Sequence, residues 1–248
     1  ARRALQNNPS PKAAAALRAE LATATTDEWR IALINALAFR KDARSVGVIR
    51  KFTSSPNADV ARAAVAALGD IATDPAVETL TAMLKTARPP LRDTVVDASI
   101  RGAEALMARG SRDRAAEIYE QLGGASEPER IRIAAVEGLA RAQGVKAVPR
   151  LVALVNWNDV HMRLIAAQAL QDMPDPKVTP ELVAAMDKTS PAATAMLLDV
   201  LGRRADAAAM PAVATLIAVR SCFDFENIGA YDFTFISRNF YAADAAYT

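Results

Sequence analysis

A helical pattern returns every 31 residues along most of this chain. It consists of a leucine preceded by apolar residues eight, four and three positions earlier, and it recurs at Leu37, Leu68, Leu139, Leu170 and Leu201. Neighbouring members lie 31 residues apart except for Leu68 and Leu139, whose separation of 71 is two periods plus nine residues. Apolar side chains at these offsets share one face of an α-helix. The period therefore predicts six similar units, each of them a pair of short helices.

Prolines mark the second helix of the later units. Pro149, Pro180 and Pro211 lie 31 residues apart, each in front of an apolar run. Inside a helix a proline removes a hydrogen bond and clashes with the preceding turn, which costs about 3 kcal/mol or more, whereas in the first turn the lost bond is at most one. We therefore expect each proline to lie in the first turn of its helix, as a structural mark.

Capping patterns at the expected helix starts agree with this division. Thr25-x-x-Glu28 has the spacing of a capping box. In three other places, a residue that can cap a helix directly precedes a proline, which is favoured as the first helical residue. These pairs are Asp74-Pro75, Asp175-Pro176 and Ser190-Pro191.

The nine additional residues fall in the third unit, where Ile100 is the nearest equivalent of the recurring leucine. They predict a longer helical hairpin that interrupts the regular stacking. Insertions in repeat arrays often lie on the binding face. A tolerated insertion with no role in binding is the alternative, and the sequence does not decide between the two.

The stretch DVARAAVAALGDIATDPAVETLTAML, residues 59–84, resembles a HEAT repeat of the short bacterial kind that is also seen in phycobilin lyases. The resemblance covers about residues 26–220. It is weaker in the third unit, and in the sixth unit Thr194 stands where the family has an arginine. Elsewhere that first-helix arginine is matched by Arg30, Arg62, Arg132 and Arg163.

The resemblance implies an all-α fold, an α/α superhelix in which helix pairs stack into a solenoid. We expect residues 1–220 to form this solenoid, as about six helix pairs plus an N-terminal helix. In similar repeats the recurring arginine pairs with an acid of the neighbouring unit or caps carbonyls between layers, so a structural role is favoured here. A ladder of arginines that binds phosphates is the alternative.

Stacked units of this kind place every second helix on one long surface, which suits the binding of another protein. We therefore predict a non-enzymatic scaffold for protein–protein interaction. Charged side chains expected on the second-helix face are the candidate binding residues: Lys146, Arg150, Lys177 and Glu181.

No catalytic motif accompanies the repeat. The sequence has no glycine-rich phosphate loop, no Gly-x-Ser-x-Gly and no His-Glu-x-x-His. HEAT-like hydroxylases hold a di-iron site with several His–Glu pairs, which the single histidine, His161, cannot supply. With Cys222 as the only cysteine, an intrachain disulfide and a cysteine-based zinc site are also excluded. We expect neither a metal, nor a cofactor, nor a catalytic residue.

Two other functions stay open. Residues 1–51 carry ten Lys and Arg against four Asp and Glu, a net charge of +6, which would suit nucleic acid. HEAT-like DNA glycosylases read DNA with aromatic side chains and a carboxylate, and Trp29 and Trp157 are weak candidates for the former. The family resemblance also admits a lyase-like chaperone for a tetrapyrrole.

Residues 221–248 break the repeat. They contain eight of the eleven Phe and Tyr residues and a net charge of −3, with a strand-like alternation in YDFTF. We expect a separate tail, irregular or with short β-strands. It could cap the sixth unit, be a non-native extension, or bind a partner.

The ends and the surroundings of the chain are weakly constrained. No apolar run approaches the ~20 residues of a membrane span. The lone thiol is compatible with a reducing, cytoplasmic compartment. Because the first residue is Ala rather than Met, we expect the natural N-terminus to be missing.

Overall fold

The computed structural model describes residues 2–124, 127–186, 188–211 and 213–214. Within these ranges all regular secondary structure is helical and there is no strand. The chain divides into two compact units, Ala1–Leu122 and Gly123–Thr248. The predicted tail at 221–248, including its short strands, lies outside the described residues.

The first unit begins with a helix pair, α1 and α2, where the sequence predicted one N-terminal helix. Three further pairs follow it. In chain order, its elements are α1 (Arg2–Asn7), α2 (Pro11–Thr23), α3 (Asp27–Phe39), η1 (Ala43–Ser45), α4 (Val46–Arg50), α5 (Ala58–Ile71), α6 (Asp74–Thr86), α7 (Arg92–Ala108) and α8 (Arg112–Leu122).

The second unit continues the alternation of first and second helices. The last second helix begins at Met210 and is described only in part. The elements before it are α9 (Glu129–Gln143), η2 (Gly144–Ala147), α10 (Val148–Val155), α11 (Val160–Asp172), α12 (Val178–Met186), α13 (Pro191–Arg204) and η3 (Ala207–Ala209).

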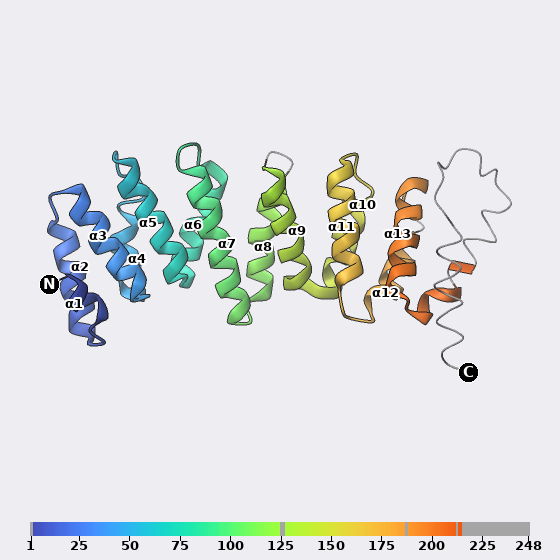
Figure 1. Cartoon of the computed structure of the whole chain (residues 1–248), viewed down its shortest axis with the longest axis horizontal. Helices are drawn as coiled ribbons and strands as arrows, with labels where there is room; N and C mark the ends of the chain where they lie inside the picture. The colour runs from blue at the N-terminus through green and yellow to red at the C-terminus, as the bar shows by residue number, and fades with distance from the viewer. Residues whose placement is uncertain (1, 125–126, 187, 212, 215–248) are drawn as a thin grey trace. The chain divides into compact units, whose positions relative to one another are not determined.

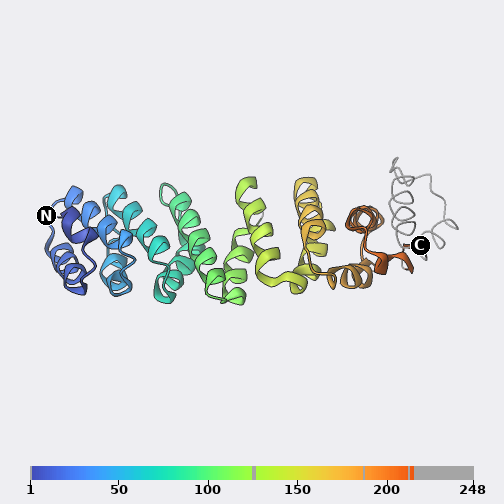
Figure 2. The same ribbon diagram turned by 60° about the horizontal axis from the view of Figure 1, so that its bottom comes forward.

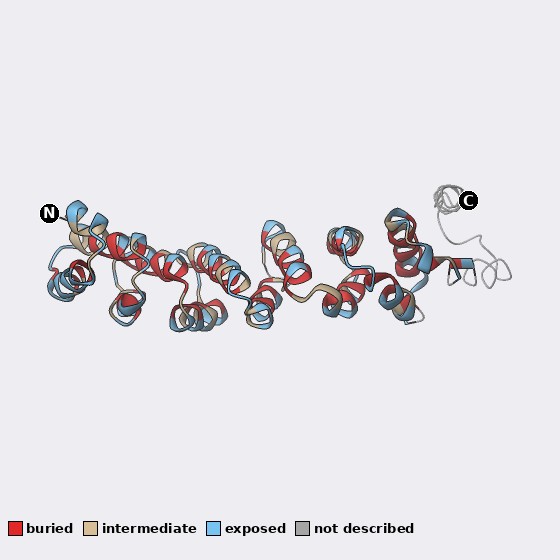
Figure 3. Cartoon of the chain, turned by 90° about the horizontal axis from the view of Figure 1, so that it is seen from below, coloured by how far each residue is buried: buried red, intermediate tan, exposed pale blue. Residues whose placement is uncertain are grey.

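Each unit has two layers. In the first unit α3, α5 and α7 pack side by side, and α2, α4 and α6 form the other layer (Figure 1 and Figure 2). In the second unit the first layer is α9, α11 and α13, and the second contains α10 and α12. Buried and exposed residues alternate along the helices from α2 onward, as the amphipathic pattern requires (Figure 3). The predicted all-α fold of stacked helix pairs is therefore confirmed in each unit.

The recurring leucines form the core of both units. All five are at most 4% exposed, and the apolar residues three and four positions before them are buried as well. Trp29, eight positions before Leu37, is only half-buried. The pattern in the sequence thus corresponds to the face that each first helix buries.

In the third helix pair of the repeat, Ile100 does not occupy the position of the recurring leucine. Ser99 occupies that position, 31 residues after Leu68, and is fully buried, whereas Ile100 is partly exposed. The Ser99 hydroxyl donates to the carbonyl of Val95 at 2.7 Å, which satisfies the polar group within its own helix. A serine that is satisfied in this way can replace an apolar anchor, so the apolar pattern missed it.

The inserted residues lengthen α7 at its C-terminal end. This helix runs nine residues beyond Ser99, whereas α5 runs three beyond Leu68. Just beyond the extension, Arg109 donates to the carbonyl of Ala72 at 2.5 Å and pairs with Asp74 at 3.4 Å. The insertion therefore connects the third helix pair of the repeat, α7 and α8, to the second, α5 and α6.

Helix caps recur eleven positions before the anchor leucine. α3 begins after Thr26, whose hydroxyl accepts the amide of Trp29, so the expected cap at Thr25 is off by one residue. Ser190 caps α13 ahead of Pro191, as expected. The expected caps Asp74 and Asp175 are wrong: α6 begins after Thr73, and α12 begins only at Val178.

None of the helices that the structure describes is both long enough and apolar enough to cross a membrane.

Candidate protein-binding face

A groove between successive second helices lies on the predicted binding face of the second unit. It lies between α10 and α12 and has a volume of about 440 Å³. Pro149 lies on one wall and Glu181 on the other, with small apolar side chains such as Ala153 and Ala184 between them. Such a surface can take up a partner side chain, with a carboxylate at its rim.

The other predicted binding residues are exposed outside this groove. Lys146 lies in η2, Arg150 in α10 and Lys177 in the turn before α12. Their side chains make no hydrogen bond or ion pair with any residue that the structure describes. Of the four predicted residues, only Glu181 lines the groove.

The first unit repeats this design. A groove of about 560 Å³ lies between α4 and α6, with Arg50 on one side and Glu78 and Ala82 on the other. A smaller hollow of about 280 Å³ lies between α2 and η1 and is lined by Lys41, Arg44 and other residues. A groove between second helices thus occurs in both units, and the sequence did not reveal it.

The three repeated prolines lie at equivalent places. Pro149 is the second residue of α10, Pro180 the third of α12, and Pro211 follows Met210 in the last helix. All three are exposed. A first-turn amide has no partner within its own helix, so proline in these places removes no bond from the helix.

Arg132 joins two repeats through an ion pair. Its guanidinium lies 2.5 Å from the Oδ2 atom of Asp159, and the two side chains are 13% and 31% exposed. Asp159 is also the N-cap of α11, since its Oδ1 accepts the amides of His161 and Met162 at 3.0 and 3.2 Å. The hydrogen bond from Arg132, followed by that from the Met162 amide, holds the pKa of Asp159 below its ordinary value of 3.8.

Arg30 makes a longer version of the same link. It pairs with Asp27 at 2.8 Å, and the other oxygen of Asp27 accepts the side-chain amide of Asn57 at 2.8 Å. Asn57 caps α5 at the position that Asp159 has in α11. An acid between two polar side chains thus connects the first repeat to the cap of the next.

The other two family arginines differ. Arg62 pairs with Asp59 of its own helix, and both side chains are well exposed. This ion pair therefore does not connect one repeat to the next. The Nε atom of Arg163 is buried and has no hydrogen-bond partner among the described residues. The four arginines therefore do not form one ladder of equivalent contacts.

Two arginines that the sequence reasoning missed connect neighbouring helix pairs. Arg204 donates to the carbonyls of Leu170, Gln171 and Met173 at 2.9, 3.2 and 2.6 Å, and to that of Asp175 at 3.1 Å. These groups end α11, and a helix end has carbonyls without partners of its own. Burial lowers the pKa of Arg204, but a guanidinium stays charged.

Arg40 does the same at the other end of the chain. It donates to the carbonyls of Leu5, Gln6, Asn8 and Ser10, whose spacing is that of the four carbonyls bound by Arg204. Both arginines stand three residues after the anchor leucine, and a left-handed residue and an aspartate follow each. The repeated Arg-x-Asp was the signal in the sequence.

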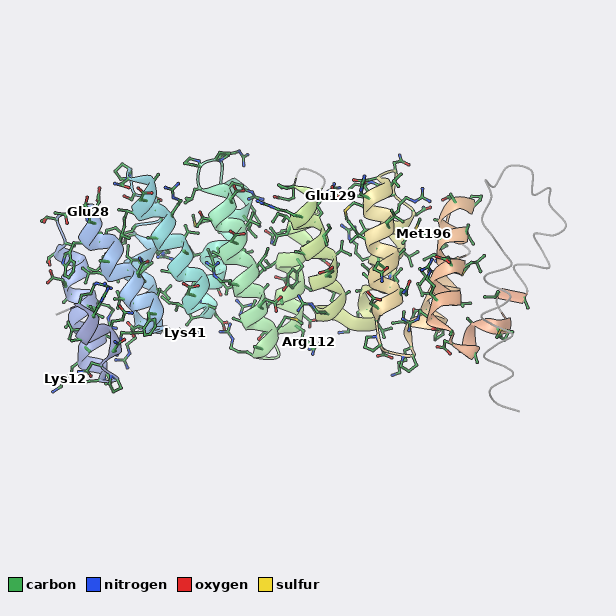
Figure 4. All side chains as sticks on the ribbon, in the orientation of Figure 1. Lys12, Glu28, Lys41, Arg112, Glu129 and Met196 are labelled. Atoms are coloured by element: carbon green, nitrogen blue, oxygen red, sulfur yellow. The ribbon has the colours of Figure 1, made fainter. Side chains whose placement is uncertain are left out.

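The residues considered for chemistry do not line the grooves described above. Trp29 donates its indole N–H to Glu20 at 2.8 Å, and Trp157 is 38% exposed beside α11. His161 lies 3.1 Å from Glu129, with 70% of its side chain exposed; Figure 4 labels Glu129 at the start of α9. Among the described residues no group of His, Cys, Asp and Glu could hold a metal ion.

A model of HEAT repeats matches residues 14–100 and 115–202. No curated protein matches the sequence. The complex of CpcE and CpcF of phycocyanin lyase from Nostoc sp. PCC7120 is 19% identical, with 84% of each chain covered and a TM-score of 0.40.

Two further solved structures are similar at the same level. Human deoxyhypusine hydroxylase in complex with glycerol is 19% identical, with 99% of this chain and 88% of that chain covered and a TM-score of 0.40. An engineered protein is 19% identical, with 93% and 94% covered and a TM-score of 0.26. Likeness at this level says nothing about what the chain binds.

Proposed function

We propose, since the chain belongs to the HEAT-repeat family, that it is a non-enzymatic scaffold that binds another protein along the second-helix face of its units. The observation that carries this proposal is the recurrence of grooves between successive second helices, between α4 and α6 and again between α10 and α12. Each groove combines small apolar side chains with charged ones at the rim, which is the composition of a protein-binding surface.

The residues that bear on chemistry support a non-enzymatic role. His161 is largely exposed beside Glu129 at a helix start, where solvated charge is the ordinary state. Asp159 is occupied as a helix cap and as the partner of Arg132. A catalytic pair needs a poised acid or base in a pocket, and neither residue lines one of the grooves.

In the second unit, the proposed contacts are Lys146, Arg150, Lys177 and Glu181. The groove between α10 and α12 would take an apolar side chain of the partner, and the three exposed cations on or next to these second helices would pair with acids. Exposed charges of this kind contribute more to the rate and specificity of association than to affinity.

Affinity capture tests the proposal. The full chain would be used as bait in a lysate of its source organism, with and without nuclease. We expect specific proteins that survive nuclease treatment and are lost with a variant that carries Lys146→Glu, Arg150→Glu and Lys177→Glu. Captured material that disappears with nuclease would instead establish nucleic-acid binding, the competing function that the basic first 51 residues suggest.

A further inference from the structure

The first unit carries a strip of cations without partners. Lys41, Arg44, Arg50 and Lys51 lie on η1, on α4 and in the residues beside them, and all four are exposed. None makes a side-chain hydrogen bond or ion pair with any residue that the structure describes. Lys12, on the neighbouring helix α2, is also exposed, and Figure 4 shows Lys12 and Lys41 at the same edge of the unit.

Three arginines elsewhere in this unit have acidic partners. Arg62 pairs with Asp59, and Arg101 with Asp70 at 3.0 Å. Arg114 reaches both Asp74 and Glu78, at 3.1 and 3.6 Å. The four cations of the strip follow one another over eleven residues and have no such compensating charge within the described part of the chain.

The acids that border the strip are already engaged. Asp42 lines the hollow next to Lys41 and Arg44, but it pairs with Arg18. Glu78 faces Arg50 across the groove between α4 and α6, but it pairs with Arg114. These carboxylates are shared with arginines outside the strip, so they compensate its charge only in part.

We propose that this strip, Lys41 to Lys51 with Lys12 beside it, binds an acidic segment of the partner protein. Carboxylates of the segment would pair with the four cations, and its apolar side chains would enter the groove beside Arg50, where Ala82 and Met83 form part of the lining. The inference rests on the proposed function and names the chemistry of the partner.

The two bordering acids favour a peptide over nucleic acid. A phosphate backbone carries a charge at every nucleotide, so a strand that follows the strip would run past Asp42 and Glu78. A peptide can place carboxylates opposite the cations and neutral residues opposite the acids. Like charges set against each other disfavour the wrong partner.

Fluorescence polarisation with the full chain tests the proposal. The probes are a labelled peptide rich in glutamate with interspersed leucine, the matching lysine–leucine peptide, and a labelled single-stranded DNA, all at about 150 mM salt, where exposed charges more than about 8 Å apart are largely screened. We expect the acidic peptide to bind more tightly than the DNA and the basic peptide not to bind.

The decisive variant carries Arg44→Glu, Arg50→Glu and Lys51→Glu. We expect it to weaken binding of the acidic peptide by about tenfold or more, because three attractive contacts become repulsive. The matched control, with Arg62→Glu, Arg101→Glu and Arg203→Glu, changes the net charge equally on first helices and should bind as the unaltered chain does. If the reversed variant does not fold, the three glutamine substitutions at the strip give a milder test.

Three results would overturn the inference: no binding of the acidic peptide, tighter binding of DNA, or equal loss in the control. None of them bears on capture of a protein partner in general. If the variant with reversed charges at the strip still captures the partner protein, the strip does not bind that partner. The proposed scaffold function would then stand, and only this inference would be wrong. Loss of all captured material with nuclease would remove both.

Discussion

Asp159 shows how one side chain can join two repeats. Its Oδ1 caps α11 and its Oδ2 binds Arg132 of α9. Replacement by asparagine keeps an oxygen for the cap and removes the charge, whereas replacement by alanine removes both. We expect Asp159→Ala to lower the midpoint of urea unfolding more than Asp159→Asn does. Equal effects of the two variants would contradict the double role.

The charge of Asp159 also predicts a dependence on pH. Because the pKa of this carboxyl is lower in the folded chain than its ordinary 3.8, the carboxylate contributes stability that is fully present above that value. This contribution is lost as the pH falls through the lower, folded pKa. The difference in stability between the unaltered chain and Asp159→Asn should therefore be larger at neutral pH than at roughly pH 3. Urea unfolding at the two pH values measures it, and a constant difference would exclude the charge effect.

At the scale of the element, α5 and α7 approach each other closely at Gly69. A β-carbon added there would lie 2.8 Å from the Cα atom of Ala98 and 2.9 Å from its carbonyl oxygen. We expect Gly69→Ala to destabilise the chain by about 1–3 kcal/mol, because the two backbones must separate. Gly47, in α4, has open space around it, so Gly47→Ala is the control and should stabilise by roughly 0.4–1 kcal/mol. Thermal unfolding of both variants measures these changes in stability. If Gly69→Ala leaves the stability unchanged, α5 and α7 do not pack closely at this position.

The junction between α11 and α13 depends on Arg204. Four carbonyl groups accept its hydrogen bonds, so Arg204→Met, which keeps the apolar stem, should cost about 2 kcal/mol of unfolding free energy. Its neighbour Arg203 pairs with Asp199 at an exposed site, and Arg203→Met should change stability by less than about 0.5 kcal/mol. Chemical unfolding followed by circular dichroism compares the two. If both variants lose similar amounts of unfolding free energy, the hydrogen bonds of Arg204 do not stabilise the junction between α11 and α13.

At the scale of the whole molecule, the sequence predicted what depends on burial and missed what depends on local satisfaction of polar groups. The buried leucines must be apolar, so their period is visible in the sequence. Ser99 was hidden because a hydrogen bond within the helix allows a polar residue in the core. The role of Arg40 was hidden for another reason, since the carbonyls it binds lie 30 to 35 residues earlier. The candidate grooves could not be predicted at all, because they form between side chains of successive repeats.

The proposed scaffold would hold a protein partner along the second-helix face. Site-specific photo-crosslinking tests it most directly. A photoreactive amino acid would be placed at Ala82 or Ala184, which line the two grooves, and at Glu28 or Gln168, which are exposed on first helices. The scaffold function predicts that a partner protein crosslinks from Ala82 or Ala184 and not from Glu28 or Gln168. Crosslinks that come only from the first helices, or equally from all four positions, would contradict it.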